Sequence, residues 1–247
     1  MGAMDYSFVR DRVERIRDRI EAAASRSGRS AADIELLAVS KFHPIEAVAA
    51  AWEAGLRSFG ESRVQEAEGK FAPFVDAHSG LRLDMIGHLQ SNKVKKAVSL
   101  FDRIESVDSV SLLLELDERA RKAALRREVL LELHTGEESK EGFGSADELY
   151  SALELLLSRP DCALKLRGLM TMAPNTRDES AVRASFSSLR AALEGASSRF
   201  GLKCAQGGFC VLSMGMSGDY EFAVEEGSTL LRIGTAIFGA RQLGDAL

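Results

Sequence analysis

The feature that most constrains the fold is an alternation of short, β-rich apolar runs with longer helical stretches along almost the whole chain. The strand-like runs are residues 34–39, 57–60, 82–87, 102–107, 128–133, 164–171, 209–213 and 229–233. The helical stretches between them are residues 45–54, 63–74, 91–99, 109–124, 145–158, 178–199 and 218–227. Strands that alternate with helices in this way predict parallel βαβ units.

Eight strand-like runs in a chain of 247 residues favour a closed barrel. A (β/α)8 TIM barrel has eight parallel strands and typically about 250 residues. An open doubly wound sheet is the competing architecture. We expect one α/β domain over residues 1–247, with residues 1–4 (MGAM) treated as an expression remnant. An additional N-terminal helix is expected within residues 5–26, where apolar residues recur three or four positions apart.

Composition narrows the classes of partner and compartment. The net charge of −5 gives no global field that would favour nucleic acid or an anionic membrane. Cys162, Cys204 and Cys210 form no CxxC pair, which is typical of a reducing compartment. With neither a secretory start nor a long apolar run, the sequence indicates a cytoplasmic protein. The histidines have no HxH or HExxH spacing, so no metal site is predicted.

A lysine follows the first predicted strand. Residues 36–44 read LLAVSKFHP, so Lys41 comes directly after a buried run. In a barrel, the C-terminal ends of the strands form the functional face. One interpretation is a lysine whose stem lies along apolar surface while its ammonium group reaches solvent. The other is an amine that forms a Schiff base with an aldehyde, which requires a site for the rest of that ligand.

Two loops near the C-terminus would supply such a site. Residues 212–219 read LSMGMSGD and residues 228–241 read STLLRIGTAIFGAR, after the seventh and eighth predicted strands, where barrels frequently bind phosphate. Backbone N–H groups at glycines and hydroxyl groups can contact an anion. The candidates are Ser213, Gly215, Ser217, Gly218, Gly234 and Thr235. Ordinary turn chemistry is the alternative, but with a lysine on the same face the loops indicate pyridoxal 5′-phosphate (PLP) as a ligand.

Seven motifs carry a resemblance to a known family. They are LLAVSK (36–41), FGESRVQE (59–66), IGHLQSNK (86–93), ESKEGF (138–143), RGLMTMAP (167–174), LSMGMSGD (212–219) and GSTLLRIGTAIFGAR (227–241). Over roughly residues 10–241 the chain resembles the YggS/PROSC family of PLP homeostasis proteins, which look like the barrel half of alanine racemase. The last two motifs are long and, together with the lysine context, highly specific.

The resemblance implies the residues of a PLP site. It implies that Lys41 carries the Schiff base and that Arg232 lies close to the cofactor. Phosphate contacts are implied for Ser213, Ser217, Gly234 and Thr235, and further cofactor contacts for Ser62 and His88. Lys140 matches a lysine that the family retains, as an accessory or transfer residue.

Four positions depart from the pattern of the family. Ser62 stands where Asn is usual, so we expect a polar contact on the ring side to be shortened or replaced by water. Leu83 and Asp84 stand where the family commonly has Trp and His, and His134 stands where it usually has Asn.

The resemblance implies binding of PLP without robust turnover. Racemisation needs acid–base groups on both faces of the cofactor, and in alanine racemase the second group is a tyrosine from an additional β-domain across a dimer. The present sequence ends at Leu247, and of Tyr6, Tyr150 and Tyr220 only Tyr220 follows a site loop. We therefore expect a monomer that holds PLP and passes it to apo-enzymes. A PLP-dependent amino-acid racemase and a barrel with an inert lysine are the alternatives.

Overall fold

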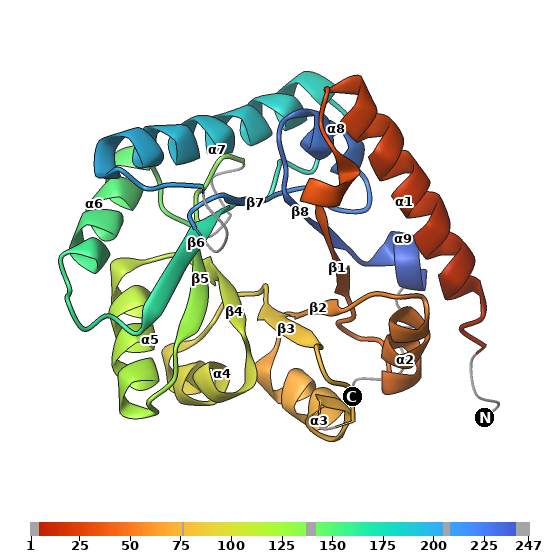
Figure 1. Ribbon diagram of the computed structural model, residues 1–247, viewed down its shortest axis with the longest axis horizontal. Helices are drawn as coiled ribbons and strands as arrows, with labels where there is room; N and C mark the ends of the chain where they lie inside the picture. Colours follow the sequence, from red (N-terminus) through yellow and green to blue (C-terminus); the bar gives the residue numbers. More distant parts are fainter. Residues whose placement is uncertain (1–4, 76, 137–141, 205–207, 241–247) are drawn as a thin grey trace.

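A computed structural model describes residues 5–75, 77–136, 142–204 and 208–240. Its strands form a closed parallel barrel in chain order from β1 to β8, with β8 paired to β1 and the helices arranged around the outside (Figure 1). This confirms the predicted TIM barrel and excludes the open doubly wound sheet. Among the described residues, no helix combines the length and apolar character needed to cross a membrane.

The elements lie where the alternation places them, with ends displaced by at most three residues. The strands are β1 (Glu35–Val39), β2 (Ser58–Glu61), β3 (Arg82–Met85), β4 (Arg103–Val107), β5 (Arg127–Glu132), β6 (Leu164–Met170), β7 (Val211–Ser213) and β8 (Leu230–Ile233). The helices are α1 (Phe8–Arg26), α2 (Ile45–Glu53), α3 (Val64–Val75), α4 (Val94–Leu100), α5 (Val110–Lys122), α6 (Ala146–Leu157), α7 (Glu179–Phe200), α8 (Tyr220–Glu225) and α9 (Thr235–Phe238). The short 3₁₀ turns are η1 (Ala31–Asp33) and η2 (Ser91–Lys93).

The barrel interior is filled with alternate side chains from the strands, because successive residues of a strand face opposite sides. Leu37 and Val39 of β1 pack there with Leu230 of β8. Gly60 of β2 faces the same space, where a Cβ atom would lie 2.4 Å from Cδ2 of Leu37. A side chain larger than hydrogen at position 60 would displace Leu37, so this glycine serves packing.

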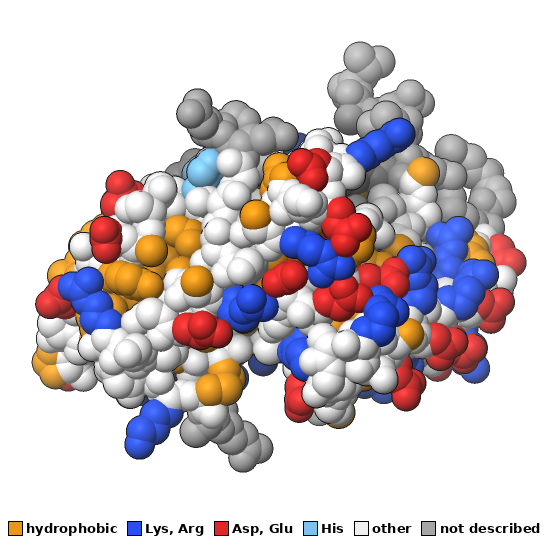
Figure 2. Space-filling model, turned by 90° about the horizontal axis from the view of Figure 1, so that it is seen from above, with side chains coloured by type: hydrophobic (Ala, Val, Ile, Leu, Met, Phe, Trp, Pro, Cys, Tyr) orange, Lys and Arg blue, Asp and Glu red, His pale blue; other side chains and the backbone are white. Residues whose placement is uncertain are grey.

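The outer face of α1 is charged, and ion pairs join it to neighbouring helices. Arg26 of α1 pairs with Glu225 of α8 at 2.7 Å, and Arg183 of α7 pairs with the same carboxylate at 2.6 Å. Figure 2 shows acidic and basic side chains interleaved on this side of the molecule rather than gathered by sign. Exposed pairs of this kind contribute about 0–1 kcal/mol each, so they give little stability and create no single-sign field.

The N-terminal ends of the strands enclose a group of charged residues, here named the basal ion layer. Its members are Glu35, Arg82, Asp84, Arg103 and Glu128. Arg103 is 1% exposed, donates from Nε to Asp84 at 2.9 Å, and lies 3.3 Å from Glu35. Burial opposes ionisation of Glu35, but the charges of Arg103 and Arg82 and a hydrogen bond from Ser58 lower its pKa. Asp84 stands at one of the two positions where the family commonly has Trp and His. In this chain its carboxylate binds Arg103 and belongs to the basal ion layer.

Candidate functional site

Lys41 lies at the C-terminal end of the barrel and faces inward. It continues the alternation of Glu35, Leu37 and Val39, whose side chains point into the interior. Lys41 lines a cavity of about 550 Å³ with residues that follow β2 and β3, among them the predicted Ser62 and His88. The structure thus brings three of the predicted site residues together at one opening.

The cavity beside Lys41 is cationic. Arg63 and Lys93 line it with Lys41, and no acidic residue occurs among the described residues of its lining. The Nδ1 atom of His88 is 3.1 Å from Oδ2 of Asp108, so this carboxylate orients the imidazole. A cavity with this lining attracts an anionic ligand.

The two glycine-containing loops meet at the same end of the barrel. Gly215 adopts a φ of 97°, which brings its carbonyl oxygen to the backbone N–H of Arg232 at 3.0 Å. Ser217 reaches across to the loop after β8, where its hydroxyl oxygen accepts from the backbone N–H of Ala236 at 3.1 Å. A Cβ atom on Gly234 would lie 3.3 Å from the carbonyl oxygen of Val39, so this loop adjoins the end of β1 that carries Lys41.

These loops have the donors that a phosphate group requires. Gly218 and Thr235 are exposed, and a Cβ atom on Gly218 would have no heavy atom within 4 Å. Packing therefore does not explain this glycine, whereas an open backbone that an anion can approach does. The backbone N–H groups of Gly218 and Thr235 have no acceptor among the described residues, which fits a phosphate held between the loops.

Arg232 and Ser213 lie deeper, in a buried hydrogen-bonded network. Arg232 is 4% exposed; it donates to the carbonyl oxygen of Thr171 at 2.7 Å and to the hydroxyl oxygen of Ser213. Ser213 in turn donates to Glu105. A serine has one hydroxyl proton, and here Glu105 accepts it. Ser213 therefore holds Arg232 through its hydroxyl group, and its phosphate contact stays a prediction.

Sequence reasoning missed Glu105 and Thr171. The available signal was the sequence DRIESV, in which Arg103 and Glu105 are two positions apart and therefore face the same side of β4. Both point into the barrel, where Arg103 contributes to the basal ion layer and Glu105 reaches Ser213.

Other candidate residues lie away from the site. Tyr220 is 3% exposed, with its ring beneath the guanidinium group of Arg19 at 5.5 Å, so it packs between α8 and α1. Tyr150 donates to the carbonyl oxygen of Ala192 at 3.0 Å on the outer helices. Lys140 lies outside the described residues.

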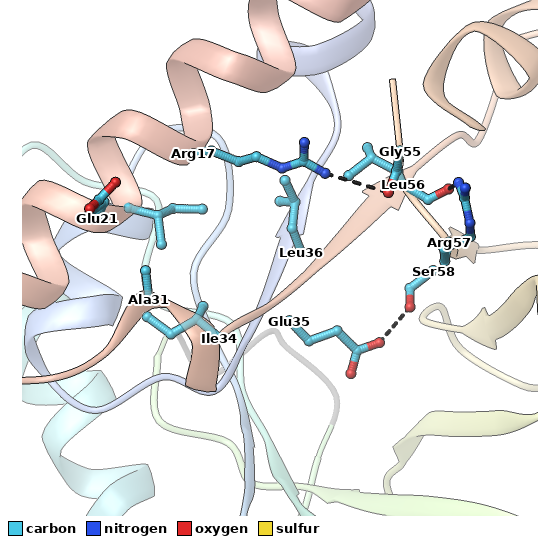
Figure 3. A pocket seen from close by; sticks show the side chains of 11 residues that line it. Arg17, Glu21, Ala31, Ile34, Glu35, Leu36, Gly55, Leu56, Arg57 and Ser58 are labelled. Carbon is cyan, nitrogen blue, oxygen red and sulfur yellow. Dashed lines mark hydrogen bonds between the residues drawn. The ribbon is translucent and has the colours of Figure 1, made fainter. Parts of the chain in front are cut away.

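A second cavity, of about 410 Å³, lies at the opposite end of the barrel, between α1 and the first residues of β1 and β2. Figure 3 shows Arg17 reaching from α1 toward the carbonyl oxygen of Gly55, and Glu35 facing Ser58. The Glu35 carboxylate also contacts Arg103. The polar groups of this cavity thus bind one another in part, and none of the predicted site residues lines it.

Comparisons with known proteins identify the family and agree with the fold. Residues 12–242 match the family described as "Alanine racemase, N-terminal domain". The chain is 39% identical over 236 residues to a Vibrio cholerae protein named "Pyridoxal phosphate homeostasis protein", covering 94% of this chain and 96% of that protein. It is 36% identical to PipY of Synechococcus elongatus with PLP bound, with a TM-score of 0.75 over 90% of this chain and 100% of PipY.

A more distant likeness concerns the fold alone. An alanine racemase of Clostridium difficile superimposes with a TM-score of 0.73 at 13% identity, covering 97% of this chain and 58% of the racemase.

Proposed function

The chain belongs to the family of the alanine racemase N-terminal domain, and from that premise we propose that it binds PLP through a Schiff base to Lys41 and serves PLP homeostasis without turnover of its own. The observation that carries the proposal is the meeting, at one end of the barrel, of an inward-facing lysine and two loops with open donors. The PLP-bound PipY structure supports the choice of ligand.

Each predicted residue receives a role. Ser217, Gly234 and Thr235 hold the phosphate from the loops after β7 and β8. Ser62 and His88 line the opposite side of the opening, where His88 is oriented by Asp108. These groups bind the ligand from two sides and place its aldehyde beside the Lys41 amine.

Arg232 is buried beneath the proposed phosphate site. Its guanidinium group is held by Thr171 and, through Ser213, by Glu105. An arginine fixed in this way keeps its charge and cannot accept a proton, so it supports binding by orientation and charge.

When bound, PLP would supply an aldehyde, and Lys41 is the residue whose Nζ would hold it covalently. The residues of this chain favour binding of PLP over catalysed conversion of a substrate. Racemisation requires a second acid–base group opposite the lysine, and the tyrosines of this chain pack on the outer helices and the N-terminal segment. The curated relatives are named for PLP homeostasis and not for a catalysed reaction.

Replacing Lys41 tests the proposal. The purified protein is incubated with PLP, reduced with borohydride and mapped by peptide mass spectrometry. We expect one stable adduct, on Lys41, and complete loss of the visible absorbance band in Lys41→Ala. Lys93→Ala is the matched control, since Lys93 is a second amine of the same cavity. An adduct that persists in Lys41→Ala, or that maps to Lys93, contradicts the proposal.

Handover and turnover require separate measurements. We propose that a cytoplasmic monomer passes PLP to apo-enzymes, so an apo-enzyme mixed with the loaded protein regains activity at a rate above that of spontaneous release. Incubation with L- or D-alanine should give no racemisation at ordinary enzymatic rates of about 1–1000 per second. Racemisation in that range would instead identify an enzyme.

A further inference from the structure

A buried ion cluster lies behind the barrel wall, around the peptide that carries Lys41. We name it the Lys70 cluster, and its members are Ser40, Glu61, Glu66 and Lys70. The Nζ atom of Lys70 lies 2.8 Å from the carbonyl oxygen of Ser40, 2.8 Å from Oε1 of Glu61 and 3.0 Å from Oε1 of Glu66. An ammonium group has three protons, and the cluster provides an acceptor for each.

The cluster holds the backbone on both sides of Lys41. On one side, the Ser40 hydroxyl donates to Glu61 at 2.6 Å, and the Ser40 carbonyl oxygen accepts from Lys70. On the other side, the backbone N–H of Phe42 donates to Glu66 at 2.5 Å. Phe42 has a φ of 66°, a left-handed conformation that a non-glycine residue keeps only where its surroundings hold it.

The cluster and the cavity share two adjacent strand ends. At the end of β1, Ser40 faces outward into the cluster and Lys41 faces the cavity. At the end of β2, Glu61 faces the cluster and Ser62 faces the cavity. The same two peptide segments therefore carry the cluster on one face and the proposed PLP contacts on the other.

Burial distinguishes this cluster from a surface ion pair. Ser40 and Glu61 are 0% exposed, and 8% of the Lys70 side-chain surface is exposed. Burial raises the pKa of Glu61, although the Lys70 ammonium group and the Ser40 hydroxyl oppose this change. Apolar residues of the same size would fill this place without the cost of removing charges from water, so stability alone is a weak explanation for the cluster.

We propose that Lys70 and Glu61 are positioning residues for Lys41: they fix the end of β1 from outside the barrel so that the amine faces the aldehyde. The inference rests on the proposed function of Lys41. Loss of the cluster should weaken covalent capture of PLP while leaving the phosphate loops, which follow β7 and β8, in place.

The test separates covalent capture from phosphate binding in the full chain. The single variant Lys70→Met would leave the Glu61 carboxylate buried without its cation and could prevent folding. The double variant Lys70→Met/Glu61→Gln removes both charges and avoids this problem. Capture of PLP is followed by the visible band and borohydride trapping, and non-covalent binding by calorimetry with pyridoxine 5′-phosphate, which has an alcohol in place of the aldehyde. We expect capture of PLP to weaken on the order of 10-fold or more, since small misplacements of a reacting group have effects of this size. Binding of pyridoxine 5′-phosphate should stay within about 2-fold, because the phosphate contacts are untouched.

Lys96→Met is the matched control. Lys96 also pairs with a glutamate of α3, Glu68, but 57% and 49% of the two side-chain surfaces are exposed. This variant should bind both ligands as the wild type does. Equal weakening of both ligands in the double variant would reveal a merely structural role and overturn the inference, as would unchanged capture of PLP. Absence of a Lys41 adduct in the wild type would instead overturn the proposed function itself.

Discussion

The two ends of the barrel both contain charged residues, but they use them in opposite ways. At the N-terminal end, the basal ion layer is closed: Arg103 is surrounded by Asp84 and Glu35, and Arg82 pairs with Glu128. At the C-terminal end, the backbone N–H groups of Gly218 and Thr235 have no acceptor within the described part of the chain, and Lys41, Arg63 and Lys93 line a cavity at the same end.

The difference separates stability from function. Charges that bind one another inside the barrel are occupied by their partners, and removing one partner of such a pair is costly. Open donors contribute little to folding but can hold an anion. Glu105 links the two ends, since it lies 3.6 Å from Arg103 on one side and accepts from Ser213, the partner of Arg232, on the other.

The largest expected effect is a loss of stability when one partner of the basal ion layer is removed. Arg103→Met leaves the Asp84 carboxylate, which is 0% exposed, without its main cation. Breaking a buried pair from one side costs about 3–5 kcal/mol, so the free energy of unfolding in urea should fall by that amount. Arg103→Met/Asp84→Leu, which removes both charges, should recover part of the loss.

The same variant sharpens the comparison between the ends. At saturating PLP, the folded fraction of Arg103→Met should still form the Lys41 adduct, because the loops and Lys41 lie at the other end. If Arg103→Met lowered the free energy of unfolding by less than about 1 kcal/mol, the basal ion layer would contribute no more than an exposed surface ion pair does.

Ser217→Ala should have the opposite effect to Arg103→Met: it should weaken PLP binding and leave stability nearly unchanged. Ser217 is proposed to donate to the phosphate, and a hydrogen bond to a charged group contributes about 1.5–3 kcal/mol, so the affinity for PLP should fall about 10- to 150-fold. The free energy of unfolding should change by less than about 1 kcal/mol. Pyridoxal, which lacks the phosphate, should bind both proteins alike. Equal loss for PLP and pyridoxal would place Ser217 outside the phosphate site.

The sequence was sufficient for the barrel because its signals are local. Alternating strand-like and helical segments indicate the number and order of the main elements. The position of Lys41 relative to the two loops was predictable for a similar reason, since every βα loop of a parallel barrel lies at the same end.

The ion networks could not be predicted because they depend on which strands are neighbours and in which register. Glu61 and Lys70 are nine positions apart, and only the packing of α3 on β2 brings them within 2.8 Å. Arg103 reaches Glu35 across the barrel interior, 68 positions away in the sequence. The contact between Ser213 and Glu105 was not predictable for the same reason, because Glu105 comes to Ser213 from a strand across the barrel.

The smallest expected effect is a difference in pH dependence between Glu35, in the basal layer, and Glu61, behind Lys41. Although burial opposes the change, Arg103, Ser58 and Arg82 lower the pKa of Glu35. Its contribution is therefore present above its unfolded pKa of about 4.3 and is lost as the pH falls through the lower folded value. Burial raises the pKa of Glu61, so its contribution is present below about pH 4.3 and is lost as the pH rises through the higher folded value.

Replacing each glutamate with glutamine isolates its effect on how the free energy of unfolding changes with pH. Glu35→Gln should flatten the acid limb of the stability profile, whereas Glu61→Gln should remove a decline on the side of rising pH. Urea unfolding from about pH 2.5 to about pH 7 measures both, with Glu68→Gln on the exposed face of α3 as the control. If both variants changed the slope in the same direction, the two ends would not differ in how they hold charge. Opposite changes would show that burial dominates at Glu61 and that the surrounding cations dominate at Glu35.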